Sequence, residues 1–440
     1  VVIGTMENSA IFLLQSLAAI HLTMTLFLYC VTGVILLIYP LYLYITKPLN
    51  RIKRHGDLGY HFGTPELAEK YHDKQIERLK RIRLKGDLPP VYPNGWYCIA
   101  ESPRLKPKEI MPIVVFGEQL SLIRSEDGSV HLIDSYCPHL GANFNVGGRV
   151  VDNNCVQCPF HGWVFSAESG NCTRIPYNDG TIPEQARVTV WPVVERNQHI
   201  YVWFDADGSA PEWEIPNIEE IQNGEWIYKG RTEHEVACHV QEIPENGADL
   251  AHLGFLHLAG APVGNDIIRI DLSDRSPSIS HKWDGSWTAS QSEKHTSKMH
   301  LEQVLKFHGF EIPLSASVLD AIQIGPGIVH MHFDFGYLGK GIVLHHVTPE
   351  EPLLQRARFV MYSNLPRWFA KFFLLAEANQ FERDVFVWSN KRYIKNPLLV
   401  KNDGPIGKHR RWYSQFYSEN SPRLLADGSL SNRAKSVLEW

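Results

Sequence analysis

Two short cysteine–histidine pairs constrain this chain more than any other feature of its sequence. The first pair is Cys137-Pro-His139 and the second is Cys158-Pro-Phe-His161. One segment rich in glycine and β-branched residues separates them, so we expect the pairs on two loops between short strands. Together the pairs offer two thiolates and two imidazoles, which indicates one shared metal site.

The spacing of these four residues distinguishes between two kinds of site. One Cys-x-His pair and one Cys-x-x-His pair are the ligand set of a Rieske [2Fe–2S] cluster, in which two histidines replace two cysteines on one iron. A structural zinc site is the main alternative, but zinc fingers usually open with two cysteines and close with two histidines. The spacing therefore favours a Rieske cluster held by Cys137, His139, Cys158 and His161. Cys155 is then expected to be a small core residue rather than half of a redox Cys-x-x-Cys.

Length and charge narrow the class of protein further. A chain of 440 residues exceeds what one hydrophobic core usually supports, so two soluble domains and an accessory segment are expected. The formal net charge of -5, with acids and bases mixed along the chain, predicts no nucleic-acid partner. Seven cysteines do not form an even disulfide framework, and cluster ligands must stay reduced, which favours a cytosolic location.

The N-terminal segment has the composition of a membrane anchor. No charged side chain occurs from residue 11 to residue 46, and residues 22–45 are long enough to cross a bilayer as a helix. A buried core helix rarely stays apolar on every face, and a cleaved signal peptide has a basic start and a shorter apolar run. Four basic residues follow, so the positive-inside rule places the rest of the chain in the cytosol. Residues 1–46 are therefore predicted to be a single-pass membrane anchor.

The rest of the chain divides by its pattern of residues. Residues 47–90 are predicted to be a charged helical linker, because acids and bases alternate with spaced apolar residues from 66 to 83. Residues 91–207 consist of short β-type runs bounded by turn signals, which indicates an all-β Rieske domain. Residues 208–440 mix strand and helix patterns and are predicted to form the catalytic domain. The expected fold class is α+β.

A second group of candidate ligands lies in the catalytic part. Asp249 and His252 are three residues apart and share one face of a helix. There the Asp249 carboxylate could accept a hydrogen bond from the imidazole nitrogen that a metal leaves free. His252 and His257 are five residues apart, about 140° around an ideal helix. They can reach one metal only if the helix widens or ends between them.

A third ligand could come from the amphipathic stretch of residues 376–388. Two imidazoles and one carboxylate with an open face are what non-haem Fe(II) oxygenases use to bind O₂ beside a substrate. Asp384 could complete this set, but the residue pattern alone leaves Glu377 and Glu382 as rivals.

Single histidines carry little weight in a chain that has 21 of them. His330 and His332 alternate on a predicted strand, residues 328–335, and so share one face. Packing is the better interpretation for them, and a place in the substrate cavity is the minor one. His345 and His346 give a weaker signal still.

With both motifs in place, the chain resembles the Rieske non-haem iron oxygenases from residue 96 to residue 417. The resemblance implies that the mononuclear iron is held by His252, His257 and Asp384, the last in a Gln-x-x-x-Asp stretch. It also implies an antiparallel sheet in the catalytic domain.

Two further roles are implied by this resemblance. Asn246 matches an asparagine near the iron, and Asp249 matches the acid that bridges electron transfer. In related oxygenases this acid reaches a cluster histidine, here His161, across a subunit boundary in a head-to-tail homotrimer.

Within the family, the chain is similar to the cholesterol 7-desaturases, the Neverland group of animals. The similarity is carried by the membrane anchor, by the residues from Asn246 to His257, and by the tail residues 403–406 and 411–417. It implies an enzyme of the endoplasmic reticulum that uses O₂ and NAD(P)H to convert cholesterol to 7-dehydrocholesterol. A separate reductase would deliver the electrons, because no Rossmann glycine fingerprint follows a strand here.

Two other functions remain open from the sequence. A Rieske-type steroid hydroxylase would use the same machinery, since desaturation and hydroxylation diverge only after hydrogen abstraction. A membrane-bound Rieske electron carrier is a different class of protein. The set of His252, His257 and Asp384 argues against it, because a pure carrier needs no second iron.

Overall fold

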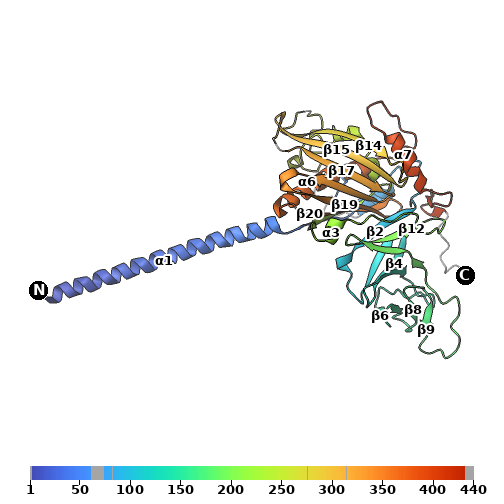
Figure 1. Cartoon of the computed structure of the whole chain (residues 1–440), viewed down its shortest axis with the longest axis horizontal. Helices are drawn as coiled ribbons and strands as arrows, with labels where there is room; N and C mark the ends of the chain where they lie inside the picture. Colours follow the sequence, from blue (N-terminus) through green and yellow to red (C-terminus); the bar gives the residue numbers. More distant parts are fainter. Residues whose placement is uncertain (1, 61–73, 82, 275, 314, 432–440) are drawn as a thin grey trace.

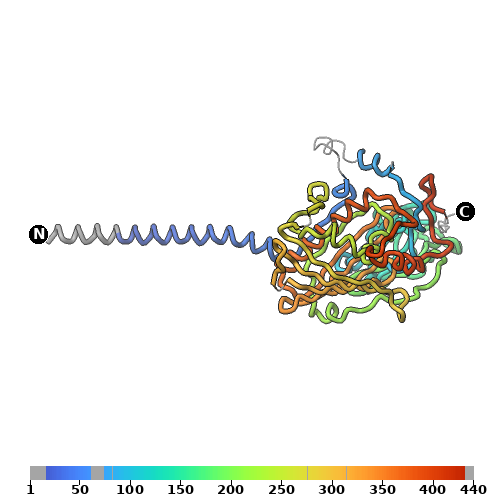
Figure 2. The backbone as a smooth tube through the Cα atoms, turned by 90° about the horizontal axis from the view of Figure 1, so that it is seen from above, coloured from blue at the N-terminus to red at the C-terminus, as the bar shows by residue number. Residues whose placement is uncertain are grey.

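A computed structural model describes residues 2–60, 74–81, 83–274, 276–313 and 315–431. A long N-terminal helix extends away from a body built of β-sheets (Figures 1 and 2). Small sheets occupy one end of this body, and a large sheet with helix α6 occupies the other (Figure 1). The predicted α+β class is confirmed.

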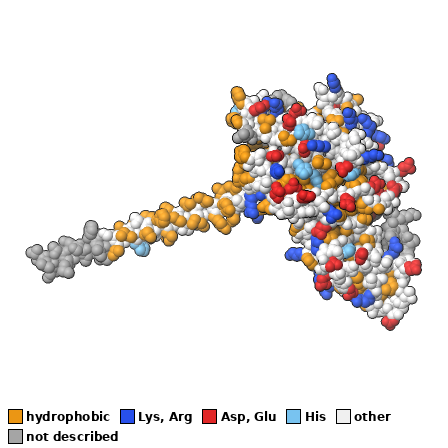
Figure 3. All heavy atoms as spheres, in the orientation of Figure 1, with side chains coloured by type: hydrophobic (Ala, Val, Ile, Leu, Met, Phe, Trp, Pro, Cys, Tyr) orange, Lys and Arg blue, Asp and Glu red, His pale blue; other side chains and the backbone are white. Residues whose placement is uncertain are grey.

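The N-terminal helix α1 runs from Val2 to Thr46. By length and composition alone, its part Ser16–Thr46 could cross a membrane, and this segment packs against nothing in the body along its most apolar window. Hydrophobic side chains cover most of the surface of α1 where its side chains are described (Figure 3). Its last turn contacts α6, where the Lys371 amine lies 4.1 Å from the ring centre of Tyr44 and hydrogen-bonds the carbonyl of that residue.

The segment after α1 differs from the helical linker expected for residues 47–90. Strand β1, Leu49–Lys53, pairs in parallel with β13, Ile227–Val236, at the edge of the large sheet. Residues 74–81 are helical, whereas much of the predicted helix 66–83 lies outside the described residues.

The charge at Arg51 explains this difference. Its guanidinium donates two hydrogen bonds, both of 2.6 Å, to the fully buried Glu382 of α6. In the sequence, a basic residue such as Arg51 indicates an exposed surface. In the structure its charge is neutralised by Glu382, which is far away along the chain. The first residues after α1 are therefore part of the body that contains the large sheet.

Three small antiparallel sheets make up residues 95–204, and the predicted all-β character of this part is confirmed. Their strand orders are β10-β5-β4-β3, β11-β12-β2 and β6-β7-β8-β9. The strands are Gly95–Glu101 (β2), Ile110–Val115 (β3), Glu118–Arg124 (β4), Val130–Asp134 (β5), Arg149–Val151 (β6), Cys155–Gln157 (β7), Val164–Ser166 (β8), Cys172–Arg174 (β9), Val190–Trp191 (β10), Val193–Arg196 (β11) and His199–Phe204 (β12).

One large sheet dominates the rest of the body, with the order β1-β13-β20-β19-β18-β17-β15-β14 and β16 paired to β15. All neighbours except β1 and β13 are antiparallel. Its remaining strands are Ile279–Ala289 (β14), Thr296–Phe307 (β15), Phe310–Glu311 (β16), Ser317–Ile324 (β17), Ile328–Asp334 (β18), Lys340–Glu351 (β19) and Leu354–Ser363 (β20).

Helix α6, Arg367–Asn390, packs across one face of this sheet. Its buried apolar side chains recur every three or four residues, as an amphipathic helix requires. They are Ala370, Leu374, Ala378, Phe381, Val385 and Trp388. The helix and the sheet together form the walls of the cavity described below.

Candidate metal centres and their cavity

The two cysteine loops share one local design. Cys137 follows β5 and Cys158 follows β7 directly. In each loop the cysteine carbonyl accepts a hydrogen bond from a glycine four residues later, Gly141 at 2.9 Å and Gly162 at 3.2 Å. Both glycines have φ of +73°, a backbone conformation that side chains with a Cβ rarely adopt. The sequence thus folds both loops into the same tight turn around the sulfur atoms.

The four side chains of these loops lie together. The rings of His139 and His161 are 4.8 Å apart between centres, on the half-exposed side, and His139 stacks on Trp163. Cys137 and Cys158 are buried beneath them. Burial and the adjacent Cys158 thiol raise the pKa of Cys137 to about 12, so the thiolates need a nearby positive charge. Two buried sulfurs below two outward imidazoles fit a Rieske cluster.

The second candidate centre lies beside the large sheet, around a very short helix. Helix α5, Leu250–Leu253, ends at Gly254, between His252 and His257. This break brings both imidazoles to one side, as their five-residue spacing requires. Asp384 of α6 joins them, so that one ligand atom of each residue lies within 4.8 Å of the others. His257 Nε2 is 3.2 Å from the Asp384 carboxylate.

A hydrogen bond fixes the orientation of the His257 ring. Its Nδ1 donates to Oε1 of Gln380, one turn before Asp384 on α6, at 2.8 Å. Arg383 donates to the same oxygen at 2.9 Å, which holds the amide oxygen rather than its nitrogen towards His257. This tautomer leaves the Nε2 lone pair facing Asp384, where a metal ion would bind. The sequence marked Gln380 only as the first residue of the Gln-x-x-x-Asp stretch. Its contact with His257 shows that it orients the imidazole ring.

Arg383 also ties the loop after His257 to α6. The side chain is fully buried, and burial lowers its pKa to about 10, so it remains charged at neutral pH. Its nitrogens donate to the backbone carbonyl of Leu256, just before His257, and to those of Ala259, Gly260 and Gly264 in the loop after it.

Arg383→Met should therefore loosen this loop. Several buried carbonyls would lose their donor, which costs about 3 kcal/mol or more in stability. We expect a lower thermal midpoint and a loss of mononuclear iron, with an unchanged cluster spectrum. Arg367→Met, at the exposed start of the same helix, is the matched control. Wild-type iron content in Arg383→Met would contradict this role.

The two rival acids on α6 lie elsewhere. Glu382 binds Arg51 and, at 3.0 Å, His234. Burial would raise the pKa of Glu382, but these two partners lower it to about 2. Glu377 lies 2.6 Å from His345. Of the three acids, only Asp384 lies beside the two candidate ligand histidines.

The Asp249 carboxylate caps helix α5 and is not within hydrogen-bond distance of the His252 ring. Its Oδ1 accepts the backbone N–H of His252 at 3.3 Å, and the same oxygen is 3.8 Å from the ring Nδ1. The ring nitrogen contacts the Asp249 carbonyl instead. Burial lowers the pKa of His252, but Asp249 and Asp384 outweigh this effect and raise it. The carboxylate hydrogen bond expected from the spacing is therefore replaced by a backbone contact, with the charge still nearby.

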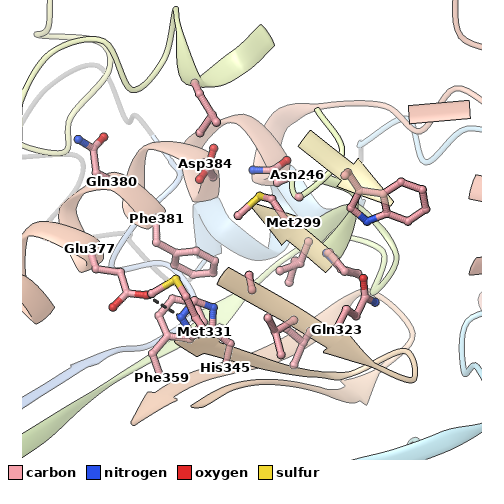
Figure 4. Close-up of a pocket in the computed structure, with 18 of the residues that line it drawn as sticks. Asn246, Met299, Gln323, Met331, His345, Phe359, Glu377, Gln380, Phe381 and Asp384 are labelled. Carbon is pink, nitrogen blue, oxygen red and sulfur yellow. Dashed lines mark ion pairs between the residues drawn. The ribbon is translucent and has the colours of Figure 1, made fainter. Parts of the chain in front are cut away.

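A cavity of about 250 Å³ adjoins the three candidate iron ligands, between α6 and the sheet. Asn246 lies beside Asp384 at one end (Figure 4). Most of the lining is apolar, and it includes Trp283, Met299, Met331, Phe359 and Phe381. These residues come from several strands and α6, so no local pattern in the sequence marks them as neighbours.

The histidines of β18 and β19 divide between the cavity and the core. Val329 and Met331 line the cavity, so His330 and His332 alternate to the other face of the strand. This agrees with packing, the preferred interpretation of that pair. His345 does line the cavity, although its sequence gave little reason to expect it.

A third group of potential ligands occupies the seam between the small sheets and the large one. Side chains of Cys98, His199 and His346 are fully buried there, with ligand atoms within 4.8 Å of one another. Burial raises the pKa of Cys98 to about 12, and the Arg358 guanidinium lies 3.7 Å from its sulfur. Tyr201 hydrogen-bonds His346 at 3.0 Å. A fixed positive charge opposes a cation, so this arrangement favours packing over metal binding.

Comparison with known proteins identifies the family. Residues 95–192 match the Rieske [2Fe-2S] domain, and residues 202–417 match the 3-ketosteroid 9alpha-hydroxylase C-terminal domain. A cholesterol 7-desaturase of Caenorhabditis elegans is 61% identical over 413 residues, which are 93% of this chain and 96% of the relative. The chain belongs to the cholesterol 7-desaturase family.

Another member of the family agrees with this assignment, and a solved structure shares the fold. A cholesterol 7-desaturase of Xenopus laevis is 44% identical, with 87% of this chain and 83% of the relative covered. The crystal structure of dicamba monooxygenase bound to dicamba superposes with a TM-score of 0.54 at 18% identity, covering 74% of this chain and 98% of that one. This likeness shows the Rieske oxygenase fold.

Membership of the cholesterol 7-desaturase family makes the chain an oxidoreductase. The cofactor set of this class is a Rieske cluster and a mononuclear iron, supplied with NAD(P)H electrons through a separate reductase. The predicted family, enzyme class and cofactors are confirmed.

Proposed function

We propose that this chain is a cholesterol 7-desaturase that introduces the C7–C8 double bond and yields 7-dehydrocholesterol. The observation that carries the proposal is the set of His252, His257 and Asp384 beside an apolar cavity, in a chain of this family. In the net reaction, C7 and C8 each lose one hydrogen, and O₂ combines with these two hydrogens, two electrons from NAD(P)H and two protons to form two water molecules.

The proposed ligand sets are separate. Cys137, His139, Cys158 and His161 hold the cluster, and His252, His257 and Asp384 hold the iron. Bound there, the cluster would supply electrons and the iron would activate O₂ beside the substrate.

The chain's own residues prepare this site. Gln380 holds the His257 ring in one tautomer. Asn246 contributes a polar group beside Asp384 without a charge. The apolar walls around Phe381 exclude water, which suits a sterol and protects the reacting carbon atoms.

Electron transfer is proposed to occur between subunits of a head-to-tail homotrimer. The hairpins near the cluster loops and helix α6 lie in different parts of the molecule (Figure 1). Beside His139 and His161, the apolar Leu140 and Phe160 are 65% and 62% exposed, which suits contact with another subunit. Asp249 keeps a third of its side chain exposed next to His252 and would face that subunit.

We further propose that α1 anchors the enzyme in the endoplasmic reticulum membrane with the catalytic part in the cytosol. Residues 1–46 would be the anchor, 91–207 the Rieske domain and 208–440 the catalytic domain. Support comes from the apolar helix and from the basic residues that follow it, and a membrane location suits an insoluble sterol.

Deleting residues 1–46 should release the protein from membranes, because the deletion leaves β1 and both candidate ligand sets in place. The cluster spectrum should be unchanged, and turnover of membrane-embedded sterol should fall. Sedimentation with vesicles measures the release. A truncated protein that still sediments would contradict α1 as the sole anchor, and it would point to the exposed Trp368 and Phe372 near the end of α1.

A steroid hydroxylase is the second candidate, favoured by the match of residues 202–417 to a 3-ketosteroid 9alpha-hydroxylase domain. Expression in a host without 7-desaturation, fed with cholesterol, separates the two functions by mass spectrometry of its sterols. The proposed function predicts 7-dehydrocholesterol. A hydroxycholesterol as the main product would establish the hydroxylase instead.

A further inference from the structure

We propose that Glu377, assisted by His345, receives the 3-hydroxyl group of the sterol and sets its orientation in the cavity. This inference rests on the proposed function and deepens it. Both residues line the cavity, Glu377 from α6 and His345 from β19. They lie away from Asp384 and Asn246 in the cavity, with Phe381 between the two groups in this view (Figure 4).

The two side chains form a pair whose hydrogen-bonding capacity is not filled. His345 Nε2 lies 2.6 Å from Glu377 Oε1, but the approach is outside hydrogen-bond geometry. Neither carboxylate oxygen accepts a hydrogen bond from the residues that the structure describes. Leaving a buried carboxylate without donors is costly, and in native proteins such a group usually has a partner. A donor supplied by a ligand would meet this demand.

Apolar groups surround the pair. Phe359 lies opposite His345 on the neighbouring strand and stacks on its ring at 4.1 Å. Phe381 packs against Phe359 at 4.7 Å, and Met331 lines the same cavity. A largely hydrocarbon ligand with one hydroxyl group fits a largely hydrocarbon cavity in which one carboxylate accepts no hydrogen bond from the described residues.

Other polar groups of the cavity would not favour a hydroxyl group over a ketone in this way. Gln323 donates one amide hydrogen to the Gly325 carbonyl at 3.1 Å, and its remaining N–H and its carbonyl oxygen would bind a ketone or a hydroxyl equally. Ser297 has no partner among the described residues, but its hydroxyl both donates and accepts, so it would bind a hydroxyl or a ketone equally. An ionised carboxylate only accepts, and it therefore requires a donor such as a hydroxyl group.

The spacing along α6 suits the orientation that the reaction needs. Glu377 and Asp384 are seven residues apart, so they share one face of the helix about 10.5 Å apart along its axis. The hydroxyl is on ring A of a sterol, and C7 is on the adjoining ring B. A hydroxyl held at Glu377 therefore directs ring B towards His252, His257 and Asp384.

Binding of two sterols that differ only at C3 tests this assignment. Cholestanol has a hydroxyl group there and cholestan-3-one has a carbonyl oxygen, which cannot donate. Losing a hydrogen bond to a charged group costs at least about tenfold in affinity, so the full-length protein in detergent should bind cholestanol at least that much more tightly. Binding is measured without O₂ so that no turnover occurs.

Glu377→Gln should reduce this preference to near one or reverse it, because the amide can donate to the ketone. Glu311→Gln, on an exposed strand, is the matched control and should keep the wild-type ratio. Cholesteryl methyl ether, which cannot donate, should bind the wild-type protein as weakly as the ketone, and this result does not depend on recovering a variant. An unchanged ratio in Glu377→Gln, or tight binding of the ether, overturns the assignment.

The same measurements separate this inference from the proposed function. If the protein prefers cholestanol through Glu377 but forms no 7-dehydrocholesterol from cholesterol, the role of Glu377 in binding the hydroxyl group stands and the proposed function is wrong. If the protein forms 7-dehydrocholesterol but binds cholestanol and cholestan-3-one equally, the proposed function stands and the role of Glu377 is wrong.

Discussion

Asp384→Ala is expected to lose the mononuclear iron and all measurable sterol turnover while its cluster spectrum stays that of the wild-type protein. Asp384 would supply the only carboxylate of the three-ligand set, and the proposed cluster ligands Cys137, His139, Cys158 and His161 lie among the small sheets, away from it. Changes in the outer partners of a metal site already cost about 10–100-fold, so the loss of a ligand should exceed this. Iron analysis and the visible spectrum of the cluster measure the two centres separately.

Glu382→Gln is the control for this experiment. It removes a buried charge from the same helix, two residues away, but its carboxylate faces Arg51 and His234. We expect the variant to keep its iron and to unfold at a lower temperature. Full iron content in Asp384→Ala, combined with iron loss in Glu382→Gln, would show that the third ligand is assigned to the wrong residue.

Asp249→Asn should keep both metal centres but lose most of its turnover, by at least about 10–100-fold. Asn is as good an N-cap as Asp, so the substitution preserves the start of α5 and removes only the charge beside His252. If this charge couples the cluster of one subunit to the iron of another, the reduced cluster should remain reduced when O₂ and sterol are added. The rate of cluster reoxidation measures this directly.

The matched control is Asp271→Asn, which removes the charge from a local cap in an exposed loop. Its reoxidation rate should be that of the wild-type protein. Wild-type reoxidation by Asp249→Asn, or full turnover by a protein shown to be monomeric, would refute the bridging role and leave the metal ligands unaffected.

Features that depend on neighbouring residues could be predicted from the sequence. The cluster loops are one example, because each donor pair spans three or four residues and the two tight turns depend on Gly141 and Gly162. The end of α5 between His252 and His257 is another, since the five-residue spacing required the helix either to widen or to end if both residues were to reach one metal. The long apolar helix α1 is a third, since it follows from composition alone.

Features that depend on distant partners could not be predicted in this way. Strand β1 was expected to be part of a helical linker, because nothing near Arg51 reveals its pairing with Glu382. The pattern of α6 also left three acids equivalent, and only their neighbours on other elements separate them. His345 had little weight for the same reason, since its partner Glu377 is far away in the sequence.

The central claim is that one chain holds both metal centres and uses them to desaturate a sterol. A single-turnover reaction tests it most directly: purified full-length protein is reduced chemically, mixed with cholesterol and O₂, and its sterols are analysed by mass spectrometry. We predict 7-dehydrocholesterol as the product, formed without added reductase and absent with Asp384→Ala. A hydroxylated sterol, or no change in cholesterol while the cluster is oxidised, would contradict the account.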